Sequence, residues 1–218
     1  MPIIDKFPLA ASGWRYIIAI LILLAMACAL EVCVLIVILA LFLLFILWFF
    51  RDPARSHYDA SPLTLIAPAD GRVVALEEVE KPGLGRVRLL SIFMNIFDVH
   101  VNRFPISGTV SAIEHISGGY YPADRPGARM KNERLNLTMT LEDGRTIMVT
   151  QVAGLVAQNI ECWVNNAPRQ GVRGERYGMI RFGSRVDLYL PLDTRIAVER
   201  GQKVKAGKTV IGIMSDAA

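Results

Sequence analysis

Residues 66–77 read IAPADGRVVALE, and this stretch indicates the fold class of most of the chain. A proline and an Asp-Gly pair favour a turn, and the apolar residues that follow favour a strand. Residues 104–114, FPISGTVSAIE, repeat the order of proline, short polar residue, glycine and strand, and residues 199–213, ERGQKVKAGKTVIGI, form a third, weaker relative. The sequence therefore contains a weak internal repeat of a turn followed by a strand.

Further short apolar segments lie at residues 87–93, 135–141, 146–152 and 186–190. Asp143-Gly144 is a typical hairpin turn between two of them. Residues 153–163 fit either a helix or a buried strand, because periodicity alone does not separate the two. Many short strands with glycine-containing turns are typical of barrels and sandwiches. We therefore expect a mainly β (α+β) domain that resembles a barrel-sandwich.

The first 50 residues have a different composition. Every residue from Ile17 to Phe50 is apolar except Glu31. The run is too long for a cleavable signal peptide, and one straight helix of this length would extend about 51 Å, beyond the roughly 30 Å hydrocarbon core. A carboxylate is least costly at the membrane interface, so Glu31 fits the tip of a helical hairpin, with one long tilted helix as the alternative. We expect residues 1–50 to form a membrane anchor and residues 51–218 one globular domain.

The charges suggest a location. Lys6 and Arg15 precede the apolar run, and Arg51 and Arg55 follow it. Positive residues favour the cytoplasmic side, so the hairpin should cross twice or re-enter on the cytoplasmic face of the cell membrane. The net charge of +4 suits an anionic leaflet. No basic stripe with interleaved aromatics points to nucleic acid, and the three cysteines form no metal-binding or disulfide pattern.

The chain has only three histidines, and one lies in a polar cluster. His100 belongs to FMNIFDVHVNRFP, residues 93–105. If this segment is extended, Asp98, His100 and Asn102 share one face. His57 and His115 fit surface positions better. His100 is therefore the candidate proton carrier, because the pKa of histidine lies closest to neutrality.

A candidate nucleophile lies in RFGSRVDLYLP, residues 181–191, where Ser184 follows Gly183 at the start of a predicted strand. A histidine could take the serine proton, and Asp70 could orient that base or act as one. A Ser/His/Asp lipid hydrolase uses the same residue types, although the G-x-S-x-G motif is absent. The residues alone leave these alternatives open.

Five motifs in order resemble the short bacterial form of the pyruvoyl-dependent phosphatidylserine decarboxylase proenzymes. They are APADGRVV (67–74), FMNIFDVHVNRFPISG (93–108), KNER (131–134), QVAGLVA (151–157) and RFGSRVDLYLP (181–191). The resemblance covers nearly the whole chain. It implies self-cleavage between Gly183 and Ser184, which yields a β chain and an α chain that stay together as partners. Ser184 would become a pyruvoyl cofactor that forms a Schiff base with membrane phosphatidylserine, and decarboxylation would give phosphatidylethanolamine.

The resemblance also assigns site residues. Asp70 and His100 match positions tied to self-cleavage and proton transfer. Longer relatives have a second histidine where Arg103 stands here, so the choice between Asp70 and His100 as the base for Ser184 stays open. A planar guanidinium suits the lipid phosphate or the substrate carboxylate. The candidates for that role are Arg103, Arg181 and Arg185.

A noncatalytic membrane-anchored carrier or scaffold is the alternative from another class. Residues 201–212, GQKVKAGKTVIG, are similar to the hammerhead of biotinyl and lipoyl domains, but the Met-Lys-Met of those carriers is absent. The sequence leaves a homo-oligomer open and does not give the acyl-chain preference.

Overall fold

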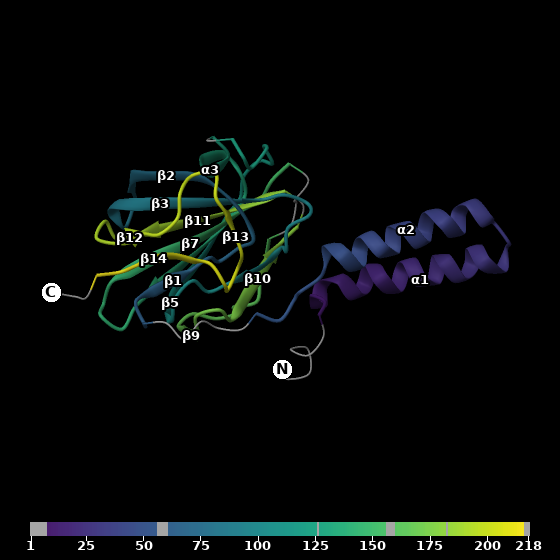
Figure 1. The fold of residues 1–218 in the computed structure, drawn as a ribbon, viewed down its shortest axis with the longest axis horizontal. Coiled ribbons are helices and arrows are strands. Elements are labelled where there is room, and N and C mark those ends of the chain that lie inside the picture. Colours follow the sequence, from purple (N-terminus) through teal and green to yellow (C-terminus); the bar gives the residue numbers. More distant parts are fainter. Residues whose placement is uncertain (1–7, 56–60, 126, 156–159, 182, 216–218) are drawn as a thin grey trace. The chain divides into compact units, whose positions relative to one another are not determined.

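The computed structural model describes residues 8–55, 61–125, 127–155, 160–181 and 183–215. The chain divides into two compact units, residues 1–54 and 55–218 (Figure 1). The helices are η2 (Ala11–Gly13), α1 (Trp14–Ala29), α2 (Cys33–Phe49) and, in the second unit, α3 (Ala128–Lys131). The strands are β1 (Thr64–Ile66), β2 (Gly71–Lys81), β3 (Gly85–Met94), β4 (Val101–Arg103), β5 (Gly108–Ile116), β6 (Arg134–Thr140), β7 (Thr146–Val152), β8 (Ile160–Cys162), β9 (Arg169–Gly171), β10 (Arg176–Ile180), β11 (Ser184–Leu190), β12 (Arg195–Ile196), β13 (Lys203–Val204) and β14 (Val210–Ile213).

The first unit is a helical hairpin, as predicted. Helices α1 and α2 pack against each other, and Glu31 lies in the turn between them with a φ of 54°. This left-handed conformation, which glycine usually supplies at the end of a helix, lets the Glu31 N–H donate to the Cys28 carbonyl over 3.1 Å. The exposed charge of Glu31 is therefore at the tip, where the sequence predicted it.

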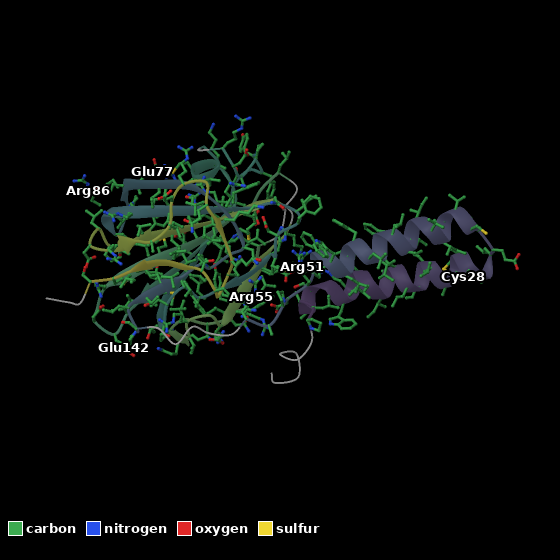
Figure 2. The ribbon with its side chains drawn as sticks, viewed as in Figure 1. Cys28, Arg51, Arg55, Glu77, Arg86 and Glu142 are labelled. Carbon is green, nitrogen blue, oxygen red and sulfur yellow. The ribbon has the colours of Figure 1, made fainter. Side chains whose placement is uncertain are left out.

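Both helices of the hairpin expose bulky apolar side chains, which are drawn mainly in carbon in Figure 2. They include Ile18, Leu21, Ile22, Leu23, Met26, Val34, Val37, Ile38, Leu41, Phe42 and Leu44. Residues 11–29 are long and apolar enough to cross a membrane, whereas α2 is slightly shorter. In the second unit the labelled surface residues Glu77, Arg86 and Glu142 are charged (Figure 2). The two units thus differ in surface chemistry.

The second unit is built from strands, which confirms the mainly β prediction. An eight-stranded sheet has the order β13-β2-β3-β11-β7-β6-β5-β9, and two three-stranded sheets have the orders β1-β14-β12 and β4-β10-β8. The four further strands predicted from apolar segments correspond to β3, β6, β7 and β11, although β6 ends at Thr140, one residue before the predicted end. Of residues 153–163, residues 160–162 form β8 and residues 156–159 lie outside the described residues.

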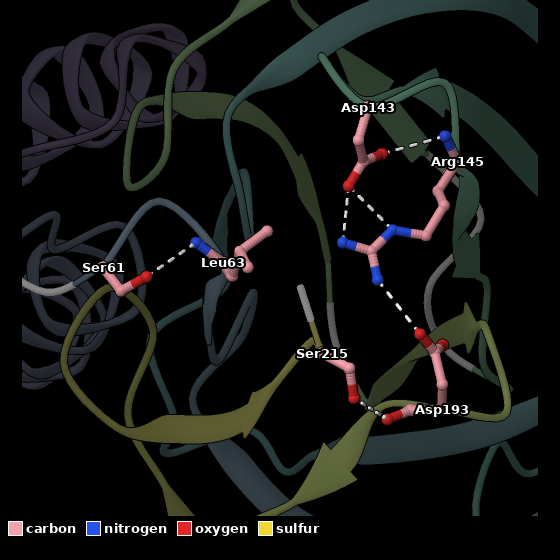
Figure 3. A network of polar contacts seen from close by, with 6 residues as sticks. All are labelled: Ser61, Leu63, Asp143, Arg145, Asp193 and Ser215. Atoms are coloured by element: carbon pink, nitrogen blue, oxygen red, sulfur yellow. Dashed lines mark hydrogen bonds and ion pairs between the residues drawn. The ribbon is translucent and has the colours of Figure 1, made fainter. Parts of the chain in front are cut away.

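Asp143-Gly144 forms the predicted turn between β6 and β7, with a φ of 83° at Gly144. Arg145 binds the Asp143 carboxylate through Nε at 2.8 Å and the Asp193 carboxylate through Nη1 at 3.1 Å (Figure 3). Hydrogen bonds from Arg145 lower the pKa of Asp143, so the Asp143 carboxylate stays charged at neutral pH and the ion pair is lost only when acid protonates that carboxylate. The contact ties the hairpin turn to the loop after β11.

Strand β11 lies at the centre of the large sheet and all of its residues are buried. Because side chains alternate along a strand, Ser184, Val186 and Leu188 face one side and Arg185 and Asp187 face the other. Val186 and Leu188 belong to the main hydrophobic core, to which the small sheets contribute Leu65, Tyr177, Ile180 and Ile211, and the residue after β4 contributes Phe104. Ser184 therefore begins β11 on the core side of the sheet.

Candidate active site

Ser184 is held between two strands. It pairs with Met94 of β3, and Arg185 next to it pairs with Val152 of β7. The Ser184 side chain is fully buried, and its Oγ has no hydrogen-bond partner among the described residues. A buried hydroxyl without a partner costs about 1–3 kcal/mol. A catalytic role is one explanation for such a group, and the neighbouring Gly183 carbonyl makes Ser184 the leading candidate for a reactive side chain.

The carbonyl group before Ser184 packs against bare backbone. Gly183 has a φ of 65°, a conformation that glycine adopts without strain. An ideal Cβ placed on Gly154 would meet the Gly183 oxygen far inside the 3.0 Å below which real Cβ atoms are essentially never found. Gly154 is therefore required for the close approach, and it fixes the Gly183 carbonyl beside the Ser184 hydroxyl.

Asn132 holds the segment that contains Gly154. Its buried amide donates to the carbonyl oxygens of Ala153 and Tyr121, both at 2.7 Å, and its Oδ1 accepts from the Tyr121 N–H at 3.1 Å. The N–H of Ala153 donates in turn to the Glu133 carbonyl at 2.9 Å. Asn132 thus positions the backbone on which the Gly183 carbonyl rests.

His100 is fully buried just before β4. Its Nδ1 lies 2.9 Å from the Asp98 carbonyl oxygen, which can only accept a hydrogen bond. Nδ1 must therefore donate, and in the neutral ring the lone pair is on Nε2. This tautomer suits a base that acts through Nε2.

The neighbours of Asn102 show on which side of the sheet His100 lies. The Asn102 Nδ2 donates to the Met94 sulfur at 3.6 Å, and the Asn102 Oδ1 accepts from Gln151 Nε2 at 2.9 Å. Met94 pairs with Ser184 and Gln151 pairs with Val186, so these side chains share the core side of the large sheet. His100 lies just before β4, where the Ile180 N–H still donates to the His100 carbonyl at 3.4 Å, so the pairing with β10 reaches His100 and favours the side of Asn102 for its ring.

The predicted polar triplet is broken at Asp98. Residues 95–98 form a turn, and the Asp98 carboxylate accepts from the Asn95 N–H at 2.9 Å. The turn ends the extended conformation that the sequence pattern assumed. Of the three residues, His100 and Asn102 therefore remain on the expected common face.

Asp70 lies before β2 and is nearly buried. Its Oδ2 accepts from Arg55 Nη2 at 2.8 Å, and its Oδ1 accepts from the Ala206 N–H at 2.7 Å. Arg72 of β2 pairs with Phe93 of β3, and Ser184 of β11 pairs with Met94 of β3. Asp70 precedes Arg72 by two residues, so it stands two strands away from Ser184, about 10 Å at the usual strand spacing. Neither described bond of Asp70 reaches His100 or Ser184.

The three candidate anion-binding arginines lie in different places. Arg103 is buried, and its side chain lies next to Gly207, as does that of Arg55, the partner of Asp70. The Arg103 Nη1 donates to the Gly174 carbonyl at 3.0 Å. Arg181, at the end of β10, is nearly buried and forms an ion pair with Glu161. None of the contacts described for Arg103 and Arg181 reaches Ser184.

Arg185 lies on the opposite side of the sheet from Ser184. Its Nε donates to Asp187 at 2.5 Å and its Nη2 donates to the Ser91 hydroxyl at 2.8 Å. Burial, helped by the Asp187 charge, raises the pKa of Tyr189 on the same side to about 12. Arg185 therefore fits a structural role in holding β11 better than a role in binding substrate.

Replacing Arg185 with methionine should leave the Asp187 carboxylate buried without its cation and lower the free energy of unfolding by about 3–5 kcal/mol. Arg86→Met is the matched control, since Arg86 pairs with Glu78 at the surface and should change stability by less than about 1 kcal/mol. Chemical denaturation of the detergent-solubilised chain compares the two. Equal losses would contradict the assigned role of Arg185.

A cavity of about 170 Å³ opens next to Gly183. Its walls come from the end of β3 and the turn after it, the loop before α3, and the segment after β7. The lining residues are Phe93, Ile96, Pro122, Ala123, Asp124, Leu155 and Gly183. A small molecule in this cavity would therefore lie against Gly183, the residue before Ser184.

Three residues of the site had no assigned role in the sequence. Gly154 lies in the QVAGLVA motif and Asn132 in the KNER motif, and neither motif predicts what these residues contact. Gln151, hydrogen-bonded to Asn102, was likewise unassigned. The sequence shows only that these residues belong to the motifs. Their contacts depend on how β6, β7 and β11 pair in the sheet.

Comparison with known proteins gives consistent matches. The family model described as phosphatidylserine decarboxylase matches residues 42–212. The phosphatidylserine decarboxylase proenzyme of Desulfotalea psychrophila is 43% identical over 212 residues, 95% of this chain and 97% of the relative. That of Magnetococcus marinus is 51% identical over 168 residues, 76% of each chain. That of Ralstonia nicotianae is 41% identical over 204 residues, 93% of this chain and 94% of the relative.

Proposed function

The chain belongs to the phosphatidylserine decarboxylase family and is a decarboxylase enzyme, and from this premise we propose that it is a self-cleaving, pyruvoyl-dependent enzyme that converts phosphatidylserine to phosphatidylethanolamine. The main support is the buried Ser184 hydroxyl beside the Gly183 carbonyl, which is held on Gly154. Family membership favours this function over the noncatalytic carrier and the lipid hydrolase.

In the proposed cleavage, Ser184 Oγ attacks the carbonyl carbon of Gly183. An ester bond forms, the peptide C–N bond breaks, and the Ser184 nitrogen becomes an amine. We assign His100 Nε2 as the base that takes the hydroxyl proton and passes it to the departing nitrogen, because the bond from Nδ1 to the Asp98 carbonyl leaves the lone pair on Nε2. Asp70 is assigned a positioning role, since Arg55 and Ala206 engage both of its oxygens.

Loss of the Ser184 α-proton then expels the Gly183 carboxylate and leaves a double bond between Cα and Cβ of residue 184. Water replaces the nitrogen, which leaves as ammonia, and a pyruvoyl group results. The products are Met1–Gly183 and Ser184–Ala218. They should stay associated, because β11 of the small fragment lies between β3 and β7, and its β14 pairs with β1.

The site suits such a group at position 184. A pyruvoyl group would supply an electron-accepting carbonyl that binds the substrate amine and takes up the electron pair left behind when carbon dioxide departs. Residue 184 is buried beside the cavity at Gly183, so water is excluded while that charge develops. His100 is the residue that we assign to return a proton to the product carbon.

We place the enzyme on the cytoplasmic face of the cell membrane. The exposed apolar side chains of α1 and α2 would be unfavourable in water and suit lipid. Arg15 and Arg51 flank the hairpin, and by the positive-inside tendency both of its ends face the cytoplasm. The hairpin would thus keep the enzyme at the surface that contains its substrate.

The function is tested with the purified full chain in mixed micelles of detergent and phosphatidylserine, without added pyridoxal phosphate. We expect carbon dioxide and phosphatidylethanolamine in equal amounts, and loss of both products after hydroxylamine treatment, which blocks a reactive carbonyl. Release of fatty acid instead would support the lipid hydrolase, and activity that resists hydroxylamine would contradict the pyruvoyl mechanism.

Gly154→Ala should block self-cleavage, because the added Cβ would displace the Gly183 carbonyl. We expect the uncut chain to accumulate, as seen on a denaturing gel over time. Gly127→Ala is the control, since Gly127 has a φ of −68° and a Cβ there would meet nothing within 4 Å. Cleavage of Gly154→Ala at the wild-type rate would show that this packing is not needed.

A further inference from the structure

We propose that the catalytic unit docks onto the surface of a phospholipid bilayer through three apolar side chains around the mouth of its cavity. These side chains, Ile96, Phe97 and Leu155, are called the apolar rim below. The proposal rests on the proposed function and adds a second membrane contact to that of the helical hairpin. It makes the rim part of how the enzyme reaches phosphatidylserine.

The size of the cavity is the first argument. At about 170 Å³ it is smaller than the roughly 300–1,000 Å³ of pockets that enclose drug-sized ligands. It can admit a serine headgroup but not two acyl chains. Pulling both chains into water is strongly unfavourable, because every exposed methylene adds to the loss. The acyl chains must therefore stay in the bilayer while the headgroup enters, so the cavity mouth must meet the bilayer surface.

The composition of the rim is the second argument. Ile96 and Phe97 are 41% and 64% exposed in the turn after β3, and Leu155 is 60% exposed after β7. Two of the three, Ile96 and Leu155, also line the cavity. Bulky apolar side chains from segments far apart in sequence thus gather at one opening. Exposed apolar groups at the mouth of a site mark a surface that contacts a partner or a membrane.

The residues near Pro122, on the wall of the cavity before α3, also suit a bilayer surface. Tyr121, next to the lining residue Pro122, is 52% exposed. Lys131 Nζ lies 5.6 Å from the centre of its ring. Tyrosine is enriched at membrane interfaces, and lysine is attracted to anionic lipids. The charge and the aromatic ring therefore favour an anionic bilayer over a protein partner as the occupant.

Kinetics on two forms of the substrate test the rim. Phe97→Ser should raise the KM for long-chain phosphatidylserine in vesicles by about tenfold, because part of an apolar side chain no longer enters the interface. Its activity on a short-chain, water-soluble phosphatidylserine should stay at the wild-type level. Phe97→Leu should restore activity on vesicles. Val172→Ser is the matched control, since Val172 is 53% exposed but, unlike Phe97 beside Ile96, has no chain neighbour that lines the cavity.

A spin label gives a readout that needs no activity. In the full chain with Cys28, Cys33 and Cys162 changed to serine, a nitroxide is attached at Phe97→Cys or, as control, at Glu142→Cys in the β6–β7 turn. In vesicles of phosphatidylcholine and phosphatidylserine, the label at position 97 should be accessible to oxygen and shielded from a water-soluble nickel chelate. The label at position 142 should stay accessible to the chelate.

The outcomes separate the two proposals. A wild-type enzyme that acts on both substrates, with Phe97→Ser unchanged on vesicles and a water-exposed label at position 97, would overturn the docking proposal alone. A wild-type chain inactive on both substrates would overturn the proposed function, and the spin label would still decide whether the rim enters the bilayer.

Discussion

Replacing Ser184 with alanine should leave a single uncut chain of about 24.2 kDa without decarboxylase activity. Alanine lacks the hydroxyl that attacks Gly183, so neither the ester nor the new amino terminus can form. The change removes a buried hydroxyl that has no partner among the described residues, so the fold should remain intact. A denaturing gel and a phosphatidylserine assay measure both effects.

The control for this variant is Ser111→Ala. Ser111 lies on β5 and its hydroxyl donates to the Thr138 carbonyl at 3.2 Å at the surface. It should cut itself and decarboxylate like the wild type. If Ser184→Ala still gave two chains divided after Gly183, the assignment of the scissile bond and of the cofactor precursor would be wrong.

Replacing His100 with alanine should lower decarboxylation by about 10²–10⁴-fold, the usual contribution of a positioned acid or base. Rates are normalised to the cleaved fraction, so that an effect on cleavage is not mistaken for one on turnover. His115→Ala is the control, because His115 is half exposed and pairs with Glu133 at 3.1 Å. Normal turnover by the cleaved His100→Ala enzyme would remove His100 from the decarboxylation step.

The same variants separate the two candidate bases for cleavage. If His100 activates Ser184, His100→Ala should slow cleavage more than Asp70→Asn does. Asparagine at position 70 can still accept from the Ala206 N–H and loses mainly the charge that faces Arg55. The time course of cleavage after synthesis compares them. A larger defect in Asp70→Asn would return the role of base to Asp70.

The local features of the fold could be predicted from the sequence because they depend on near neighbours. Glu31 is a charge inside an apolar run, which favours a hairpin tip over the middle of a membrane helix. Asp143-Gly144 supplies the backbone conformation that the β6–β7 turn needs. Ser184 follows a glycine at a strand start, and the structure places it there. In each case the signal lies within a few residues.

The site contacts could not be predicted in this way, because they depend on how strands pair. Gly154 meets Gly183 only because β7 and β11 are neighbours in the sheet. The ion pair between Arg55 and Asp70 joins residues that are 15 apart in the sequence, and no turn motif predicts it. Strand alternation puts Arg185 on the side of the sheet opposite Ser184, where it binds Asp187 and Ser91.

The central claim is that the chain cuts itself and turns Ser184 into a carbonyl group, and mass spectrometry of the purified protein tests it most directly. We predict a fragment of residues 184–218 that is lighter by one ammonia than the same peptide beginning with serine, and that gains two hydrogens on borohydride reduction. An intact chain of 24.2 kDa as the only species in an active preparation, or a fragment with an unmodified serine, would contradict the claim.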